Sequence, residues 1–183
     1  MREALAGYCR QGGRLLVSGS KWGENLQKDD FGKNVLKCTY GGRFSNLSSA
    51  PVKGAGTSFR IQGGANESIY AVPSMECVMP VEGAYSAFAY TNGNYGSGTV
   101  YCGEDYRTFV LGFPLECVEN TDVRTYLMQT IVQTLLSKKR RINYQEQLPK
   151  FDPAKLPDQT HMFVNKDLKE QIREILTKQK EKE

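Results

Sequence analysis

The chain has 183 residues, which is enough for one domain with an appendage but not for two full domains. Its net charge of +4 comes entirely from residues 138–183, because residues 1–137 carry 12 basic and 12 acidic side chains. Nucleic-acid-binding domains usually carry their basic surface on the folded domain, so this distribution argues against that class. We interpret the dense basic run at residues 138–141 as a helix end and solvated linker, in preference to a targeting patch.

The cysteines argue against a metal centre. Their number is odd, their spacing is wide, and neither a CxxC motif nor a Cys/His pair occurs among Cys9, Cys38, Cys77, Cys102 and Cys117. The glycine-rich segment 93–98 lacks the Lys-Ser/Thr end of a phosphate-binding loop, so no cofactor is predicted. Residues 1–20 contain no signal peptide, and no apolar run reaches membrane-spanning length.

The first elements alternate between helical and strand patterns. Residues 2–10 place Leu5, Tyr8 and Cys9 on one helical face, and two glycines then end the helix. Residues 14–19 predict a strand buried on both faces, as in a parallel sheet. The polar loop at residues 20–26 follows the carboxyl end of that strand, where ligand crevices of open α/β sheets lie.

Residues 28–100 change character, with many glycines and short strand-like runs. They predict a β-rich insertion, whose candidate strands are residues 35–39, 58–61, 68–72 and 85–90. Residues 98–102 and 107–112 then predict an antiparallel hairpin, with Glu104 and Asp105 as exposed turn residues. A helix over residues 123–136 follows, capped by a residue between 120 and 122.

The last 46 residues predict a tail. Three prolines at four-residue intervals, between residues 149 and 157, indicate an extended linker. A terminal helix over residues 165–180 carries a narrow apolar stripe that must pack against something. The predicted organisation is therefore a domain at residues 1–137 and a linker with terminal helix at residues 138–183.

Two segments carry a family resemblance. Residues 4–19, with their helix, Gly-Gly turn and buried strand, resemble part of the class I glutamine amidotransferase-like domains, and residues 106–116 resemble their last strand. The xanthan lyase-like and ThuA-like branches are the most similar. The resemblance implies an α/β fold: a partial flavodoxin-like parallel sheet without its N-terminal βα units, with a β-rich insertion and a C-terminal helical tail. It also implies a periplasmic, cell-surface or secreted location within a longer exported bacterial protein.

The sequence departs from that family at the catalytic position. The family's nucleophile is a cysteine at a strand end, but this chain has Ser18 and Ser20 there. A serine nucleophile needs a general base, and the only histidine is His161 in the tail. Residues 1–137 therefore have no cysteine at that strand end and no histidine, which favours a domain that is not itself an enzyme.

The candidate ligand-binding residues are Ser18, Ser20 and Trp22 in the loop after the first strand. Trp22 is the only tryptophan, and an aromatic ring in a polar loop suits stacking on a sugar or a partner, although partial burial explains it equally well. Glu116 and Arg107 are weaker catalytic candidates, since Glu116 also fits a helix entry.

Three functional hypotheses follow. The first is a non-catalytic, accessory or carbohydrate-associated domain, and the second is a hydrolase or lyase acting on polysaccharide. The third is a protein-interaction module that uses the terminal helix and the bare edge of a sheet. The expected partners are carbohydrate, a second copy of the chain or a missing upstream domain at that edge, and no nucleic acid.

Overall fold

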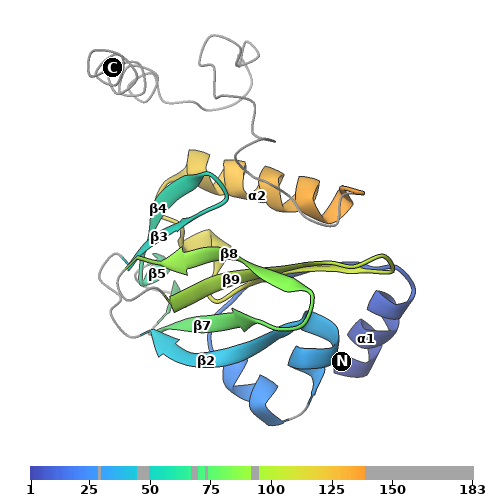
Figure 1. The fold of residues 1–183 in the computed structure, drawn as a ribbon. Helices are drawn as coiled ribbons and strands as arrows, with labels where there is room; N and C mark the ends of the chain where they lie inside the picture. The colour runs from blue at the N-terminus through green and yellow to red at the C-terminus, as the bar shows by residue number, and fades with distance from the viewer. Residues whose placement is uncertain (29, 45–49, 67–69, 73, 92–94, 139–183) are drawn as a thin grey trace. The chain divides into compact units, whose positions relative to one another are not determined.

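The computed structural model describes residues 1–138, except residues 29, 45–49, 67–69, 73 and 92–94 (Figure 1). The strands are β1 (Arg14–Val17), β2 (Cys38–Phe44), β3 (Ala50–Gly54), β4 (Thr57–Ile61), β5 (Gly64–Asn66), β6 (Tyr70–Ala71), β7 (Met75–Pro80), β8 (Ala84–Tyr90), β9 (Tyr95–Cys102) and β10 (Arg107–Leu111). The helical segments are α1 (Arg2–Arg10), η1 (Gly23–Lys28), η2 (Gly32–Leu36), η3 (Leu115–Cys117) and α2 (Thr121–Leu136).

The main sheet has six strands in the order β1-β10-β9-β8-β3-β4. Among the described strands of this sheet, only β1 and β10 pair in parallel, and the other neighbours are antiparallel. The flavodoxin-like parallel sheet predicted from the sequence is therefore wrong. Short turns join β3 to β4 and β9 to β10, and a short turn can join only antiparallel neighbours, whereas parallel neighbours need a long crossover.

Residues 28–100 are not an insertion beside this sheet. They supply β3, β4, β8 and most of β9, which are continuous with β10 through hydrogen-bonded neighbours. The same region also forms two smaller sheets, β2 with β7 and β5 with β6. The described part of the chain is thus built mainly from strands, in one mixed six-stranded sheet and two two-stranded sheets, with few helices.

Most locally encoded elements occur where they were predicted. Both helices are confirmed, and the Asn120 side chain caps α2 by accepting hydrogen bonds from the backbone of Asp122 (2.8 Å) and Val123 (3.1 Å). The strand expected at residues 35–39 is wrong: η2 occupies its first half, and Lys37 adopts a left-handed φ of 59° before β2 begins. The strand expected at residues 68–72 is present only at Tyr70–Ala71 among the described residues. The helix predicted in the tail lies outside the described residues.

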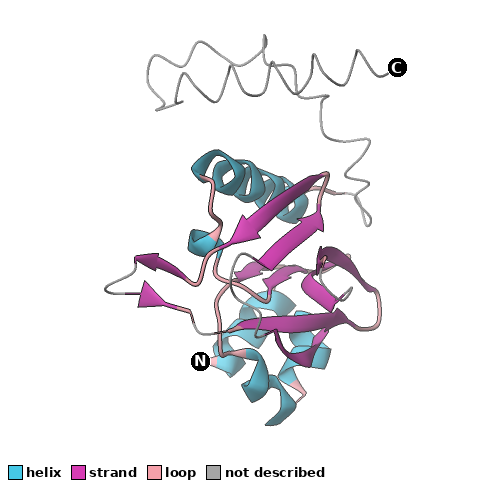
Figure 2. Cartoon of the chain, turned by 90° about the vertical axis from the view of Figure 1, so that its left-hand side faces the viewer, coloured by secondary structure: helices cyan, strands magenta, loops and turns pink. Residues whose placement is uncertain are grey.

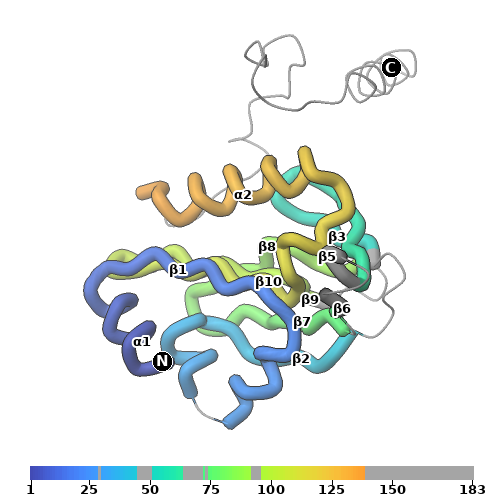
Figure 3. The backbone as a smooth tube through the Cα atoms, turned by 180° about the vertical axis from the view of Figure 1, so that it is seen from behind, coloured from blue at the N-terminus to red at the C-terminus, as the bar shows by residue number. Residues whose placement is uncertain are grey.

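The central strands alternate between two cores. On β10, Phe109 and Leu111 pack with residues of α2, while Val110 faces a second cluster with Val78 of β7. On β1, Leu16 likewise packs against the first cluster. This period of two places α2 over one face of the sheet and the β2–β7 layer over the other, as Figures 1, 2 and 3 show.

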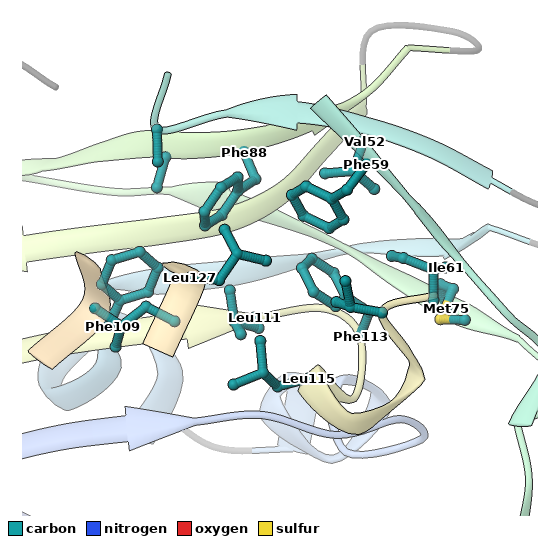
Figure 4. Close-up of a cluster of buried hydrophobic side chains, with 14 of the residues drawn as sticks. Val52, Phe59, Ile61, Met75, Phe88, Phe109, Leu111, Phe113, Leu115 and Leu127 are labelled. Atoms are coloured by element: carbon teal, nitrogen blue, oxygen red, sulfur yellow. The ribbon is translucent and has the colours of Figure 1, made fainter. Parts of the chain in front are cut away.

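The larger core is aromatic. Phe59 and Phe88 meet edge to face with ring centroids 5.8 Å apart, and Phe59 meets Phe113 at the same distance (Figure 4). Leu127 of α2 closes this cluster and is 1% exposed. Burial of each such side chain contributes about 1.5–3 kcal/mol, so this face holds much of the stability.

Glycines allow β7 to lie directly against the main sheet. A Cβ atom on Gly112 would collide with the backbone oxygen of Glu76, and one on Gly96 would collide with that of Val78. The contact is hydrogen-bonded, because the Glu76 backbone donates to the Gly112 carbonyl at 2.7 Å and the Tyr90 hydroxyl donates to the Glu76 carbonyl at 3.1 Å. The backbone of β7 is thereby fixed beneath β9 and β10.

Among the described residues, no helix combines the length and the apolar character required to span a bilayer.

Candidate functional site

Ser18 links the end of β1 to the segment after β10. Its hydroxyl donates to the Phe113 carbonyl at 3.2 Å and accepts from the Leu115 backbone at 2.9 Å. The Gly19 backbone adds a third bond to Phe113 at 3.3 Å. The Ser18 side chain therefore holds the end of β1 against the segment at Leu115, the residue before Glu116.

Trp22 is half-buried on the loop after β1. Its indole nitrogen donates to the Gly19 carbonyl at 3.2 Å, and its ring packs against the smaller apolar cluster that contains Leu26 and Val78. Ser20, in the same loop, is partly exposed. The ring therefore anchors this loop, and part of it still faces solvent.

Arg107 and Glu116 do not converge. Arg107 is 3% exposed and donates to the Thr134 carbonyl at 3.0 Å, where it satisfies a carbonyl in the last turn of α2. Glu116 is exposed, and its backbone carbonyl accepts from Arg124 at 2.8 Å. Arg124 and Thr134 are ten residues apart on the helix, or about 15 Å along its axis.

The cysteines are all buried and free. Burial raises the pKa of all five thiols, to about 12 for Cys38 and about 11 for Cys117. A nucleophilic cysteine needs a lowered pKa, so these side chains pack as small apolar residues. The described residues also contain no group of three or more potential metal ligands.

Glu76 is the residue that the sequence analysis missed. It lies on β7 and is 0% exposed, and its Oε2 accepts the backbone N–H of Gly23 at 2.8 Å. Its Oε1 has no hydrogen-bond partner within the part of the chain that the structure describes. Burial raises the pKa of the Glu76 carboxyl, and the backbone N–H groups of Gly23 and Trp22 oppose this shift.

Three more side chains surround this carboxyl. Glu24 and Arg43 form an ion pair at 2.6 Å, and each side chain is half-exposed. Arg43 also hydrogen-bonds Tyr40, whose pKa is raised by burial and then by the charges of Glu24 and Glu76. We call the set of Trp22, Glu24, Tyr40, Arg43 and Glu76 the Glu76 cluster.

Gly23 brings the parts of the cluster together. A Cβ atom there would lie 2.8 Å from Glu76 Oε2 and 2.5 Å from the Tyr40 ring, so only glycine leaves both in place. The cluster thus joins the loop after β1 to residues of β2 and β7. A glutamate inside the apolar run Met75–Pro80 is the one local signal that could have revealed it.

A separate groove lies at the β4 edge of the main sheet. It has a volume of about 610 Å³ and is lined by residues of β3, β4, β8 and the turn between β3 and β4. Its lining comprises Lys53, Gly54, Gly56, Thr57, Ser58, Ser86, Ala87, Phe88 and Ala89. Lys53 is the only charged residue among them.

Comparison with known proteins gives structural neighbours only. No protein-family model matches the sequence, and no curated protein matches it. The exo-β-1,4-mannosidase Op5Man5 from Opitutaceae bacterium strain TAV5 is similar over 75% of this chain, with 11% identity and a TM-score of 0.50. A polyextremophilic β-galactosidase from the Antarctic haloarchaeon Halorubrum lacusprofundi is similar over 73%, with 15% identity and a TM-score of 0.49.

This chain spans 23% of the mannosidase and 20% of the β-galactosidase. The structural neighbours are thus enzymes named for cleaving glycosides, and at this identity the likeness to the mannosidase establishes a shared fold alone. The resemblance to amidotransferase-like, flavodoxin-like domains is overturned, because the sheet is mixed and mostly antiparallel. The segments that suggested it are a helix, a glycine turn and two short strands, which many folds share.

Proposed function

We propose that this protein acts on carbohydrate as part of a glycoside hydrolase, and that the Glu76 cluster contacts the sugar. The observation that carries the proposal is the half-exposed pair of Glu24 and Arg43 beside two half-buried aromatic rings, Tyr40 and Trp22. The shared fold with an exo-β-1,4-mannosidase supports the same class of ligand.

The chemistry of the cluster suits a sugar. Aromatic rings offer an apolar surface to the C–H face of a pyranose, while charged side chains form strong hydrogen bonds with its hydroxyl groups. Arg43 and Glu24 already hold each other in place, and Arg43 also hydrogen-bonds Tyr40, so few side chains must be ordered on binding. Glu76 supports the surface from behind, since its carboxylate fixes the backbone of Gly23.

A second candidate function is hydrolysis by the cluster itself. Glycoside hydrolysis commonly uses two carboxyl groups in contrasting environments, one kept protonated and the other ionised. Burial raises the pKa of Glu76, whereas Glu24 is paired with Arg43. Because Glu76 is 0% exposed, proton transfer from it would require Tyr40 or the Gly23 loop to move.

Calorimetric titration with manno-oligosaccharides and galacto-oligosaccharides tests the proposal. We expect binding that Arg43→Ala weakens about tenfold and that the control Lys33→Ala, at an exposed lysine on η2, retains. Release of p-nitrophenol from aryl β-mannoside and β-galactoside, lost in both Glu24→Gln and Glu76→Gln, would favour hydrolysis by this chain. Binding without turnover would favour an accessory role, and neither binding nor turnover would overturn the proposal.

A further inference from the structure

The groove at β3, β4 and β8 has the chemistry of a site for a negatively charged ligand. Its only charged lining residue is Lys53, and no acidic residue lines it. Lys53 forms no ion pair with any residue in the described part of the chain. The groove has a volume of about 610 Å³, which lies within the usual range of small-molecule sites, roughly 300–1,000 Å³.

The register of the strands leaves Lys53 between small neighbours. Lys53 lies directly opposite Ser58 on β4 and opposite Ala89 on β8. Cross-strand neighbours on one face of a sheet are about 4.5–5.5 Å apart, so bulky residues at these positions would cover the lysine. The small residues instead leave Lys53 exposed along the open groove.

The turn that forms one end of the groove is held in a strained conformation. Ala55 and Gly56 have φ angles of 48° and 75°, the left-handed pair of a tight hairpin turn. An alanine there costs roughly 1–2 kcal/mol, yet Ala55 is 4% exposed and its carbonyl accepts from the Tyr126 hydroxyl of α2 at 3.1 Å. The helix therefore fixes this end of the groove before any ligand arrives.

We propose that this groove binds an acidic saccharide, with the Lys53 ammonium group paired to its carboxylate. Ser58, which lies opposite Lys53, adds a hydroxyl group to the same lining. The inference rests on the proposed carbohydrate function and refines it to saccharides that contain a uronic acid. It adds a second contact surface, separate in sequence from the Glu76 cluster.

The experiment is a heteronuclear NMR titration of the full ¹⁵N-labelled chain with digalacturonate, with a neutral galactose disaccharide and with acetate. We expect digalacturonate to shift the amides of Gly54, Gly56 and Ser86, with a Kd about tenfold lower than that of the neutral sugar. Lys53→Gln should remove this preference, and the exposed control Lys33→Gln should keep it. Both substitutions are on the surface, so folding is expected to be unaffected.

Equal affinity for the acidic and neutral disaccharides, or an unchanged Kd in Lys53→Gln, would overturn the inference. Acetate that matches digalacturonate in Kd and shifts would overturn the saccharide part of it. A neutral sugar that shifts Trp22 and Tyr40 while digalacturonate leaves the groove unchanged would refute the groove and keep the proposed function. If no saccharide shifts either surface, both fail.

Discussion

The two faces of the main sheet differ in size and in polarity. The face beneath α2 is closed by a continuous aromatic core, and Phe88, Phe109 and Phe113 are at most 1% exposed. The opposite face has a smaller apolar cluster, and the β7 strand that covers it carries the buried carboxyl of Glu76. The apolar packing beneath α2 therefore supplies stability, and this stability offsets the free-energy cost of burying the Glu76 carboxyl on the other face.

The largest effect expected is the loss of the α2-side core. Phe109→Ala should destabilise the fold by about 3–5 kcal/mol, because it removes a ring that is 0% exposed and leaves a cavity. Val110→Ala, on the next residue and the opposite face, should cost only about 2 kcal/mol because fewer buried groups are removed. Urea denaturation followed by circular dichroism measures both.

The two substitutions control for each other, because they change adjacent residues of one strand. A cost for Val110→Ala equal to or above that of Phe109→Ala would contradict the proposed division between the faces. A changed slope of free energy against urea would instead indicate an altered denatured state.

Local patterns in the sequence predicted local structure well. The helix at Arg2–Arg10, the strand at Arg14–Val17 and the hairpin of β9 and β10 each depend on neighbours within a few residues, and each is present. Burial of that strand on both faces was wrong, because β1 lies at the edge of the sheet and all four of its residues are only partly buried. The pairing partners of the strands could not be predicted in this way. Contacts such as β3 with β8 join residues more than 30 positions apart, and nothing in either strand specifies the other.

The candidate site, too, was predictable from the sequence only in part. The loop after β1 was predicted as part of a crevice, and its Trp22 belongs to the Glu76 cluster, but a ligand role for Ser18, Ser20 and Trp22 remains a prediction. Glu76 was missed because its environment is assembled by Gly23 and Tyr40, which lie 53 and 36 residues away in the sequence. Burial of a charged residue follows from tertiary contacts, which a local pattern does not contain.

The contact between β7 and the main sheet gives the second prediction. Gly112→Ala should destabilise by about 3 kcal/mol, because its new methyl group would meet the backbone oxygen of Glu76, which cannot rotate away. Gly63→Ala is the matched control, since its Cβ would lie 3.8 Å from its nearest neighbour, the Val72 carbonyl oxygen. Thermal unfolding should separate the two, and a Gly112→Ala protein as stable as Gly63→Ala would show that β7 is not held against β10.

The buried carboxyl gives the third prediction, a dependence of stability on pH. Burial raises the pKa of Glu76 in the folded state above its usual value of 4.5, so the folded chain binds this proton more tightly than the unfolded chain does. The stabilising contribution is complete below the unfolded pKa and is lost as the pH rises through the folded pKa. The free energy of unfolding should therefore fall across that window.

Glu76→Gln should remove this part of the pH dependence, because an amide fills the same space without a titrating proton. Relative to the wild type, the variant should gain stability as the pH rises above 4.5. Glu119→Gln, at an exposed glutamate, serves as the control and should leave the slope unchanged. Parallel curves for wild type and Glu76→Gln would mean that Glu76 ionises in the folded state at its ordinary pKa.

The smallest effect on stability is expected on the surface of the Glu76 cluster. Glu24 and Arg43 are both half-exposed, and solvent and salt screen such pairs strongly. A double-mutant cycle with Glu24→Ala and Arg43→Ala should therefore give a coupling free energy of unfolding close to experimental error. The same variants should weaken sugar binding about tenfold, since hydrogen bonds from charged groups to a ligand are directional and lost completely.

This pair of measurements decides whether the polar face is built for stability or for recognition. Weak coupling in unfolding together with a large loss of sugar affinity would assign the ion pair to ligand contact. Strong coupling in unfolding with unchanged affinity would make the pair a structural clamp on Tyr40, because Arg43 hydrogen-bonds that residue directly. The two faces of the sheet would then differ only in the size of their apolar clusters, and the Glu76 cluster would not be the sugar-binding site.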